Sequence, residues 1–289
     1  MATFKDYYSL TKPGVLYGNA LTAAAGFLLA SRSSFNFWLF VALCVGTTLI
    51  IASACVLNNY LDQDIDSKMA RTKTRAIVAG IVPGRHAVIL SIVLGVVGLV
   101  VLLLWTNWLV VSIGIGGFVD YVVLYGMLSK RLSWHGTLVG SISGAAPILA
   151  GYVAVTGRID IGAVIVFAVL FLWQMPEFYS IAVYRQKEYA AAGVPVISVV
   201  KGVKQTRTQI FWYTLAFVIA TVLLTVFGYT GYVYLVVMLA LGLYWLWLAV
   251  KGLRVEERSS DAWARRMFRF SLIILLVFCG MIMVGARLP

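Results

Sequence analysis

Residues 58–75, NNYLDQDIDSKMARTKTR, combine acidic and basic side chains in a pattern that suits a metal and a diphosphate. Asn58, Asp62 and Asp66 are four residues apart, so on a helix they share one face with about 40° of drift per step. Carboxylate and amide oxygens suit Mg²⁺, which uses one or two carboxylates and leaves its other positions to water and substrate phosphates. Basic residues that can hold phosphate oxygens follow at once: Lys68, Arg71, Lys73 and Arg75.

Two simpler interpretations of this segment compete with a metal–diphosphate site. A solvated loop whose charges set membrane topology explains the basic residues but not the acids at helical spacing. A calcium loop would use Asp62, Asp64 and Asp66, but its sixth position is Ser67 instead of Gly and its twelfth is Lys73 instead of Glu. On a helix Asp64 lies about 200° from Asp62, so we expect it to face elsewhere.

A second charged segment occurs about 120 residues later. Glu177, Tyr184 and Glu188 have the spacing i, i+7, i+11, which returns to one helical face within about 40°. Basic residues lie beside or beyond them: Arg185, Lys187, Lys201, Lys204 and Arg207. Acids followed by bases therefore occur twice. This indicates a weak internal duplication into two pseudo-repeated halves, and sites in such membrane folds lie between the repeats.

The elements that must carry these residues are membrane spans. The chain has 289 residues, of which 62% are hydrophobic and only 12% are charged, against about 25% charged residues in soluble domains. Apolar stretches of roughly 20 residues, long enough to cross a bilayer, recur along it. The sequence thus predicts an all-α polytopic membrane protein. Nine transmembrane helices are expected at 14–31, 37–59, 87–105, 108–128, 136–156, 161–184, 209–228, 232–250 and 268–286.

The basic residues predict how these spans are oriented. Of the 23 Lys and Arg residues, 20 fall on the side that holds the N-terminus, and the others are Arg32, Arg158 and Arg287. By the positive-inside rule the N-terminus is cytoplasmic and the C-terminus lies outside. Both charged segments follow even-numbered spans, so the long loops at about 60–86 and 185–208 cap the cytoplasmic side. The net charge of +12 is therefore mainly a topology signal, and we expect no nucleic-acid partner.

Five segments in order resemble a known family. NNYLDQDID fits the N-x-x-x-D-x-x-x-D motif of the intramembrane aromatic prenyltransferases, the UbiA-type superfamily, and the wider match is to its protohaem IX farnesyltransferases, the haem O synthases. Together the matching segments cover most of the chain from the first span to the sixth loop. They are TKPGVLYGN (11–19), NNYLDQDIDSKMARTKTR (58–75), KRLSWHGTLVGSISGAAP (130–147), LWQMP (172–176) and YAAAGVPVISVVKG (189–202).

The resemblance implies a fold, a location and a reaction. One transmembrane domain over 1–289 would arrange nine helices around a central cavity, open to lipid on one side and capped by the two long loops, in the bacterial inner membrane. Farnesyl diphosphate would ionise with the help of Mg²⁺, and the vinyl group of haem b would attack the allylic cation. Water would complete the hydroxyethylfarnesyl group of haem O. Whether the protein associates with haem A synthase or with terminal oxidase assembly stays open.

The resemblance also assigns roles to residues at matching positions. The expected ligands of a first Mg²⁺ are Asn58, Asp62 and Asp66, and Glu188 is the expected ligand of a second metal ion from the other half. With Lys130, these are the expected catalytic residues. The expected diphosphate-binding residues are Arg71, Arg75, Lys130, Arg131, Arg185 and Lys201. The expected cavity or haem-contacting residues are Asn19, Tyr125, Trp173, Glu177, Tyr184, His135 and Asp120.

Aromatic faces suit a site that shields an allylic cation from water. Tyr121, Tyr125 and Trp173 are the expected lining residues, although packing or lipid contact explains each of them as well. His86 and His135 could contact haem propionates or iron, but an interfacial histidine without a fixed role is the favoured interpretation of each.

Three positions depart from the family pattern. After LWQMP the family has His, and this chain has Glu177. Relatives that prenylate phenolic acids have an aspartate at this point, so Glu177 could serve the metal. Glu188 stands where the family has Asp and keeps the carboxylate on a longer arm. Asp120 lies inside the fourth span. An acid within a membrane span indicates a functional residue by default. The alternative is a protonated, neutral side chain without a role.

Three functions are consistent with these features. Farnesyl transfer to haem b is the leading hypothesis. Prenyl transfer to a quinone precursor or another aromatic acceptor within the same fold is the alternative, for which Glu177 leaves room. A non-catalytic haem-binding or transport membrane protein is the third, and such a protein would not need two acid–base clusters on one membrane face.

Overall fold

The computed structural model describes residues 2–32 and 34–285, and within these ranges every regular element is helical. Nine helices in the described ranges are long and apolar enough to cross a membrane, which confirms the predicted spans. The predicted residue Arg287 lies outside the described residues. The membrane helices are α2 (Pro13–Ala30), α3 (Phe37–Leu61), α5 (Gly84–Trp105), α6 (Trp108–Val119) continued by η1 (Asp120–Ser129) and α7 (Lys130–Leu132), α8 (Gly136–Thr156), α9 (Ile161–Tyr184), α12 (Gly202–Val226), α13 (Tyr232–Leu253) and α14 (Ser260–Gly285).

Two of these helices begin earlier than the apolar pattern predicts. α12 starts at Gly202 rather than 209, and α14 starts at Ser260 rather than 268. Their first two turns carry charged residues, so hydropathy alone places the span boundary where the charged residues end. The backbone continues as helix beyond that boundary because charged side chains at the water interface do not interrupt it.

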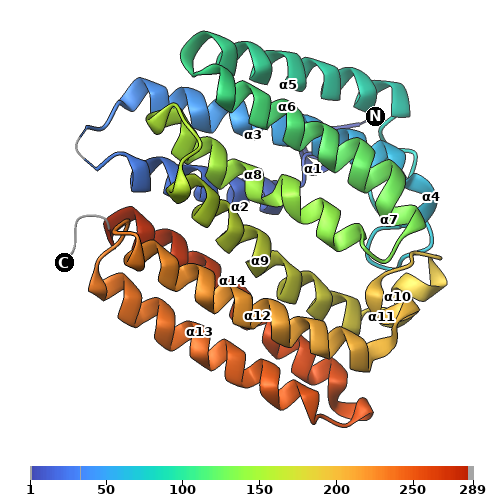
Figure 1. Cartoon of the computed structure of the whole chain (residues 1–289). Helices are drawn as coiled ribbons and strands as arrows, with labels where there is room; N and C mark the ends of the chain where they lie inside the picture. The colour runs from blue at the N-terminus through green and yellow to red at the C-terminus, as the bar shows by residue number, and fades with distance from the viewer. Residues whose placement is uncertain (1, 33, 286–289) are drawn as a thin grey trace.

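The helices form two groups that meet along two seams. α3 packs on α5 and α2 on α8 in the first group, and α9 packs on α12 and α14 in the second. Figure 1 shows the first group above the second, with all long helices running side by side. α8 packs against α9, and α2 packs against α14, so the first and last membrane helices touch and the bundle closes into a ring.

Glycines bring the backbones of α2 and α8 close together. A Cβ added at Gly26 would lie 2.1 Å from the carbonyl oxygen of Ile148, and one at Gly151 would lie 2.0 Å from that of Ala23. Within a bilayer, where hydrophobic burial does not drive helix association, small residues permit the close backbone contact that does. These two glycines therefore set the spacing of the central helix pair.

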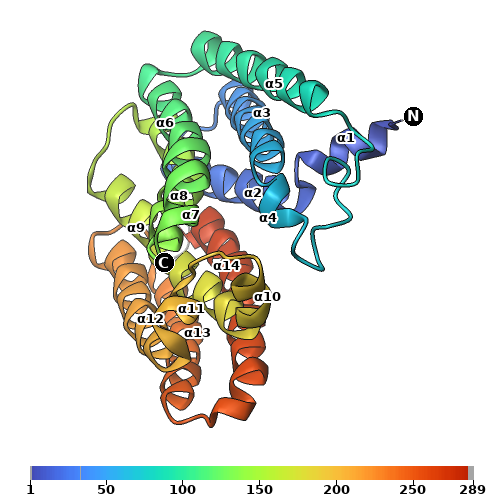
Figure 2. The same cartoon turned by 90° about the vertical axis from the view of Figure 1, so that its right-hand side faces the viewer.

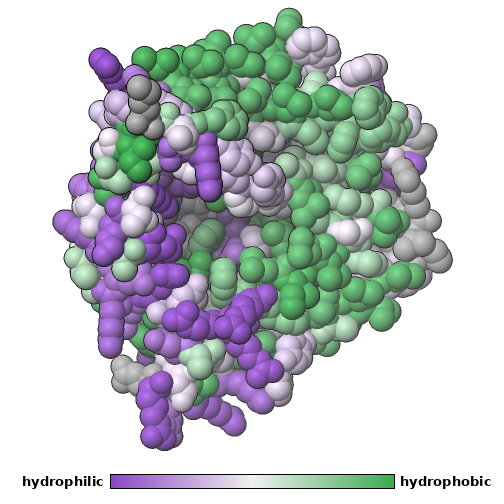
Figure 3. All heavy atoms as spheres, turned by 180° about the vertical axis from the view of Figure 1, so that it is seen from behind, coloured by the Kyte–Doolittle hydropathy of each residue, from purple (hydrophilic) through white to green (hydrophobic). Residues whose placement is uncertain are grey.

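The short helices and long loops gather at one end of the bundle, which we call the basic end (Figure 2). Seen from behind, hydrophilic residues concentrate at this end and apolar residues cover the sides, while the surface is hollowed between the two groups (Figure 3). The basic end thus collects both charged segments. Its short helices are α1 (Phe4–Leu10), α4 (Gln63–Asp66), α10 (Gln186–Ala191), α11 (Ile197–Val200) and η2 (Glu257–Ser259).

Candidate active site

A buried polar face formed by Asn58, Asp62 and Asp66, the acid stripe, lies where α3 passes into α4. Backbone hydrogen bonds from the N–H of Asp62 to the carbonyl of Asn58 (2.9 Å) and from Asp66 to Asp62 (2.8 Å) continue the helical spacing across the junction. The three residues are only 2%, 1% and 4% exposed, respectively. The end of a membrane helix therefore presents three oxygen-bearing side chains inward.

Cations from three other segments surround the acid stripe. Lys130 Nζ lies 2.5 Å from Asp62 Oδ2, and Arg75 forms an ion pair with Asp66. These two residues were expected to hold diphosphate, and the structure places both at the acids.

Lys12 is a third cation at the acid stripe, and the sequence did not reveal its role. Its ammonium group donates to Asn58 Oδ1 at 2.5 Å and lies 3.4 Å from the Tyr121 hydroxyl. Desolvation of the half-buried side chain lowers the pKa of Lys12 to about 8. The left-handed backbone of Lys12 (φ 54°), directly before Pro13, starts α2 from this point. The TKPG motif was the available signal, since it places a lysine at the mouth of the first span.

The π-helix η1 determines which side chains of the fourth span face the acid stripe. The backbone N–H of Lys130 donates to the carbonyl of Tyr125, five residues earlier. In a π-helix residues five apart stack on one face, whereas in an α-helix they would be about 140° apart. Lys130 Nζ accordingly lies 6.0 Å from the centre of the Tyr125 ring, and the Tyr121 and Tyr125 rings are 5.8 Å apart. The wide turn thus places Lys130 and two tyrosines together.

Arg131 is held mainly by Asp64 instead of pointing freely into the site. Its guanidinium donates to both carboxylate oxygens of Asp64, at 2.7 and 2.8 Å, and to the Leu61 carbonyl at 2.7 Å. This pairing lowers the pKa of Asp64 to about 2. Asp64 is 60% exposed, so it faces away from the acid stripe, as its helical position predicts. Arg131 Nη2 also lies 3.7 Å from Asp62 Oδ1.

The two cap segments meet over the acid stripe. Ile65 and Met69 from the first segment pack with Ala192 and Val194 from the second in one buried cluster. Tyr189 of α10 borders this cluster. Burial raises the pKa of Tyr189, and the positive charges of neighbouring residues oppose that rise. These neighbours come from both halves of the chain: Arg71, Lys130 and Arg185.

The acids of the second segment do not join the acid stripe in this structure. Glu188 pairs with Arg185 at 2.9 Å, and Glu177 is buried within α9. Among the described residues no group of three or more His, Cys, Asp or Glu side chains is arranged to hold a metal. Glu188 was expected to serve a second metal ion from this half of the chain; its carboxylate pairs with Arg185 in this structure, and its metal ligation stays a prediction.

The donor set at the acid stripe nevertheless fits one divalent cation. Asp62 Oδ1 is buried without a hydrogen-bond partner, whereas the Asn58 amide oxygen accepts from Lys12. Mg²⁺ typically binds through one or two carboxylates and completes its shell with water and substrate phosphates. A free carboxylate oxygen beside an amide and a second carboxylate matches that requirement without a third acid.

Two of the expected cavity residues donate hydrogen bonds to backbone carbonyls. The Trp173 indole donates to the Ser271 carbonyl of α14 at 2.9 Å within the hydrophobic core. The Asn19 amide donates to the Val15 carbonyl of its own helix. These contacts favour the packing interpretation that the sequence left open for Trp173.

Other expected residues lie around the site or away from it. Asp120 is buried at the start of η1, where Oδ2 accepts the Ser143 N–H at 3.0 Å and Oδ1 has no partner. Tyr184 lies beneath Arg185 and Arg265, and Lys201 lies over the Trp134 ring. His135 lies against the Trp134 ring and close to Ser133, whereas His86 binds Tyr7 of α1.

A helical membrane bundle with buried acids and cations at one end agrees with the prenyltransferase fold that the motifs implied. The chain belongs to the UbiA prenyltransferase family, whose family model matches residues 19–273. It is therefore a prenyltransferase by family, as the motifs predicted. A curated relative from Chromobacterium violaceum, named protoheme IX farnesyltransferase 2, is 48% identical over 286 residues, which cover 99% of this chain and 94% of the relative.

Solved structures share the fold at much lower sequence identity. One, from work on digeranylgeranylglyceryl phosphate synthase in membranes, has a TM-score of 0.81 at 19% identity and covers 98% of each chain. A UbiA homolog from Archaeoglobus fulgidus bound to DMAPP and Mg²⁺ has a TM-score of 0.74 at 14% identity, covering 94% of this chain and 99% of the homolog. These neighbours confirm the all-helical fold of a multi-pass membrane protein.

Proposed function

We propose that the protein transfers a farnesyl group from farnesyl diphosphate to a vinyl group of haem b, with addition of water, to give haem O and diphosphate in a bacterial inner membrane. The observation that carries this proposal is the buried acid stripe at the basic end, surrounded by Lys12, Arg75 and Lys130. Similarity over almost the whole chain to a relative named for this farnesyl transfer supports the choice of substrates.

The acid stripe and the cations around it would have different roles toward the departing diphosphate. Asn58, Asp62 and Asp66 would hold Mg²⁺, which when bound neutralises charge on the departing diphosphate. Lys12, Arg75 and Lys130 pair with these residues in the present structure and would donate to diphosphate oxygens once the acids serve the metal. Arg71 is exposed beside Tyr189 and extends the same positive surface.

The neighbouring aromatic residues suit the carbocation that follows. Tyr121 and Tyr125 present rings beside Lys12 and Lys130 at the inner edge of the acid stripe. Aromatic faces stabilise a cation by their quadrupole, and a site that excludes water prevents premature hydrolysis. Of the 23 Lys and Arg residues, 20 fall on the same side of the predicted spans as the N-terminus. We therefore place this side, the basic end, in the cytoplasm.

The test is product formation by the purified protein. Incubation with haem b, farnesyl diphosphate and Mg²⁺ should yield haem O, detected by mass. Asp62→Asn should lower the rate at least about 100-fold, the scale of one lost charge-stabilising contact in a transition state. Asp64→Asn, an exposed neighbour in the same segment, is the matched control and should stay within about threefold of the parent.

Two results would contradict the proposal. Parent-level turnover in Asp62→Asn would remove the acid stripe from the reaction. Product formed only with 4-hydroxybenzoate as acceptor would assign the protein to the alternative class that prenylates quinone precursors, which Glu177 leaves room for.

A further inference from the structure

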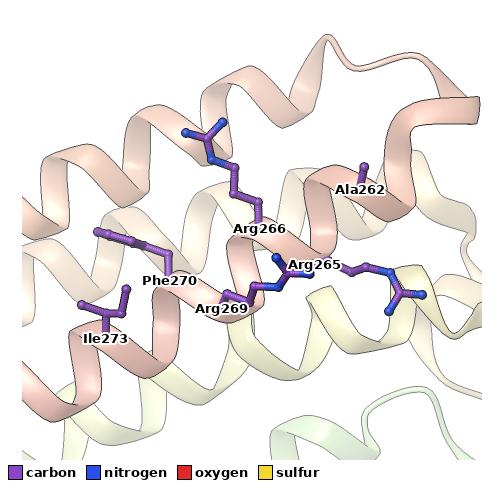
Figure 4. Close-up of a pocket in the computed structure, with 6 residues that line it drawn as sticks. All are labelled: Ala262, Arg265, Arg266, Arg269, Phe270 and Ile273. Carbon is purple, nitrogen blue, oxygen red and sulfur yellow. The ribbon is translucent and has the colours of Figure 1, made fainter.

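A groove of about 520 Å³ lies on α14 at the basic end, apart from the acid stripe. Its lining residues repeat at helical spacing along one face of α14. Figure 4 shows three guanidinium groups projecting from the helix, with an aromatic and an aliphatic side chain further along it. The lining residues are Ala262, Arg265, Arg266, Arg269, Phe270 and Ile273.

The positive charge in this groove is not neutralised by the protein. Within the described residues none of the three arginines forms an ion pair, although Asp261 lies only one turn before Arg265. Arg266 donates to the Tyr244 hydroxyl of α13 at 2.8 Å, and Arg265 lies 4.5 Å from the centre of the Tyr184 ring. Hydroxyl and ring contacts orient a guanidinium but leave its charge available to an anion.

The groove lies at the depth where a membrane surface meets its interior. Arg269 is nine residues into α14, or about 14 Å along the helix at 1.5 Å per residue, and Tyr244 is equally far from the end of α13. Tyr244 packs against Trp247 and Phe270, and Tyr and Trp mark the interfacial belt of membrane proteins. Basic residues in the loops are enough to set the membrane topology. The need to set topology therefore does not explain why arginines continue along α14 as far as the interfacial aromatic belt.

The groove lies on the exposed face of α14. The opposite face of α14, with Met267, Ser271 and Ile274, is fully buried against the bundle. Ile273 in the groove is 50% exposed, on a side of the helix that apolar residues continue. An amphipathic anion bound here would have its charged group at the interface and its apolar part in the membrane.

We propose that this groove is a binding site for an anionic phospholipid of the adjacent leaflet. Arg266 and Arg269 would bind the phosphate, whose geometry matches the guanidinium fork, and an acyl chain would lie along Phe270 and Ile273. Basic pockets between membrane helices recognise lipid head groups in this way. The proposal is independent of the prenyl acceptor, because only α14 side chains line the groove and no residue of the acid stripe belongs to it.

Native mass spectrometry of the purified full-length protein tests the site directly. Titration with phosphatidylglycerol should show one retained lipid, whereas phosphatidylcholine with the same acyl chains should not be retained. Arg266→Gln/Arg269→Gln should weaken phosphatidylglycerol retention at least about tenfold. The control Arg85→Gln/Lys204→Gln removes the same charge from exposed positions at the same end and should bind like the parent.

A second double variant separates binding from folding. Arg266→Lys/Arg269→Lys keeps the charge but loses the fork, so retention should lie between that of the parent and that of the glutamine variant. Equal loss in the control double variant, or equal retention of phosphatidylcholine, would overturn the site. Displacement of phosphatidylglycerol by haem b or farnesyl diphosphate would do the same, since the groove would then be a substrate site.

Discussion

Lys12 shows how one side chain completes a site that is otherwise built by a distant helix. It lies 46 residues before Asn58 in the chain, and its ammonium group is the hydrogen-bond partner of the Asn58 amide oxygen. Partly burying a charge beside a neutral amide is costly, and we expect Lys12 to offset this cost by contacting the anion that binds during the reaction. Its contribution should therefore appear in activity and not in stability.

The substitution Lys12→Met tests this role. It keeps the length of the side chain and removes the buried charge, so the thermal unfolding midpoint should be unchanged or higher. The kcat/KM for farnesyl diphosphate should fall about 100-fold. Lys5→Met, an exposed lysine on α1, is the control. A variant with lowered stability and parent-level kcat/KM would show that Lys12 is structural.

The π-helix η1 sets the position of Lys130 relative to Tyr125. Tyr125 and Lys130 are separated by five residues and stack only because the turn is wide. A one-residue deletion between them restores the four-residue spacing of an α-helix, which also keeps both on one face. A one-residue insertion at the same place allows neither arrangement.

We therefore expect an asymmetry between deletion and insertion. Deleting Met127, an exposed residue between the two, should retain at least about one tenth of the activity, whereas inserting Ala after Met127 should abolish it. Haem O formation by both variants is the measurement. Equal loss in the two variants would mean that η1 does not set the register of Lys130.

The glycines of the α2–α8 pair lead to a second prediction at this scale. A Cβ at Gly151 would overlap the Ala23 carbonyl, while one at Gly18 on α2 has nothing within 4 Å. Gly151→Ala should lower the free energy of unfolding by about 3 kcal/mol, whereas Gly18→Ala should raise it by up to about 1 kcal/mol. Unfolding in mixed detergent followed by circular dichroism measures both. Tolerance of Gly151→Ala would show that the two helices can separate without cost.

The nine spans and the acid stripe follow from local patterns and could be predicted from the sequence. Hydropathy marks the apolar runs, and the i, i+4, i+8 spacing of Asn58, Asp62 and Asp66 is a property of one helix. The role of Lys12 is set by a contact between distant segments, and η1 has the same hydropathy that an α-helix would have. The pairing of Glu188 with Arg185 competes with the predicted metal ligation, and motif matching does not register such competition.

At the scale of the whole molecule, the two halves meet at the basic end through the cluster of Ile65, Met69, Ala192 and Val194. This cluster holds both cap segments over the acid stripe and contributes little to the transmembrane core. Its loss should loosen the caps without unfolding the bundle, because local regions with few apolar contacts open independently.

The variant Met69→Ala/Val194→Ala tests this separation. Limited proteolysis should cut the cap segments faster than in the parent, and kcat/KM should fall about tenfold, while the unfolding midpoint of the bundle changes little. Ile89→Ala/Val93→Ala, at exposed positions on α5, is the control and should change neither readout. A large drop in the unfolding midpoint would mean that the caps are part of the global core.

The contact between α2 and α14 bears on how the protein is made. α14 follows α13 in the chain, and it closes the ring by packing against α2. Until then a chain with α2 through α13 already inserted holds the acid stripe in a bundle that is open along one seam. A product that stalls before α14 would leave the faces of α2 and α9 that pack against this helix open to lipid, so insertion of α14 joins the two halves along their second seam.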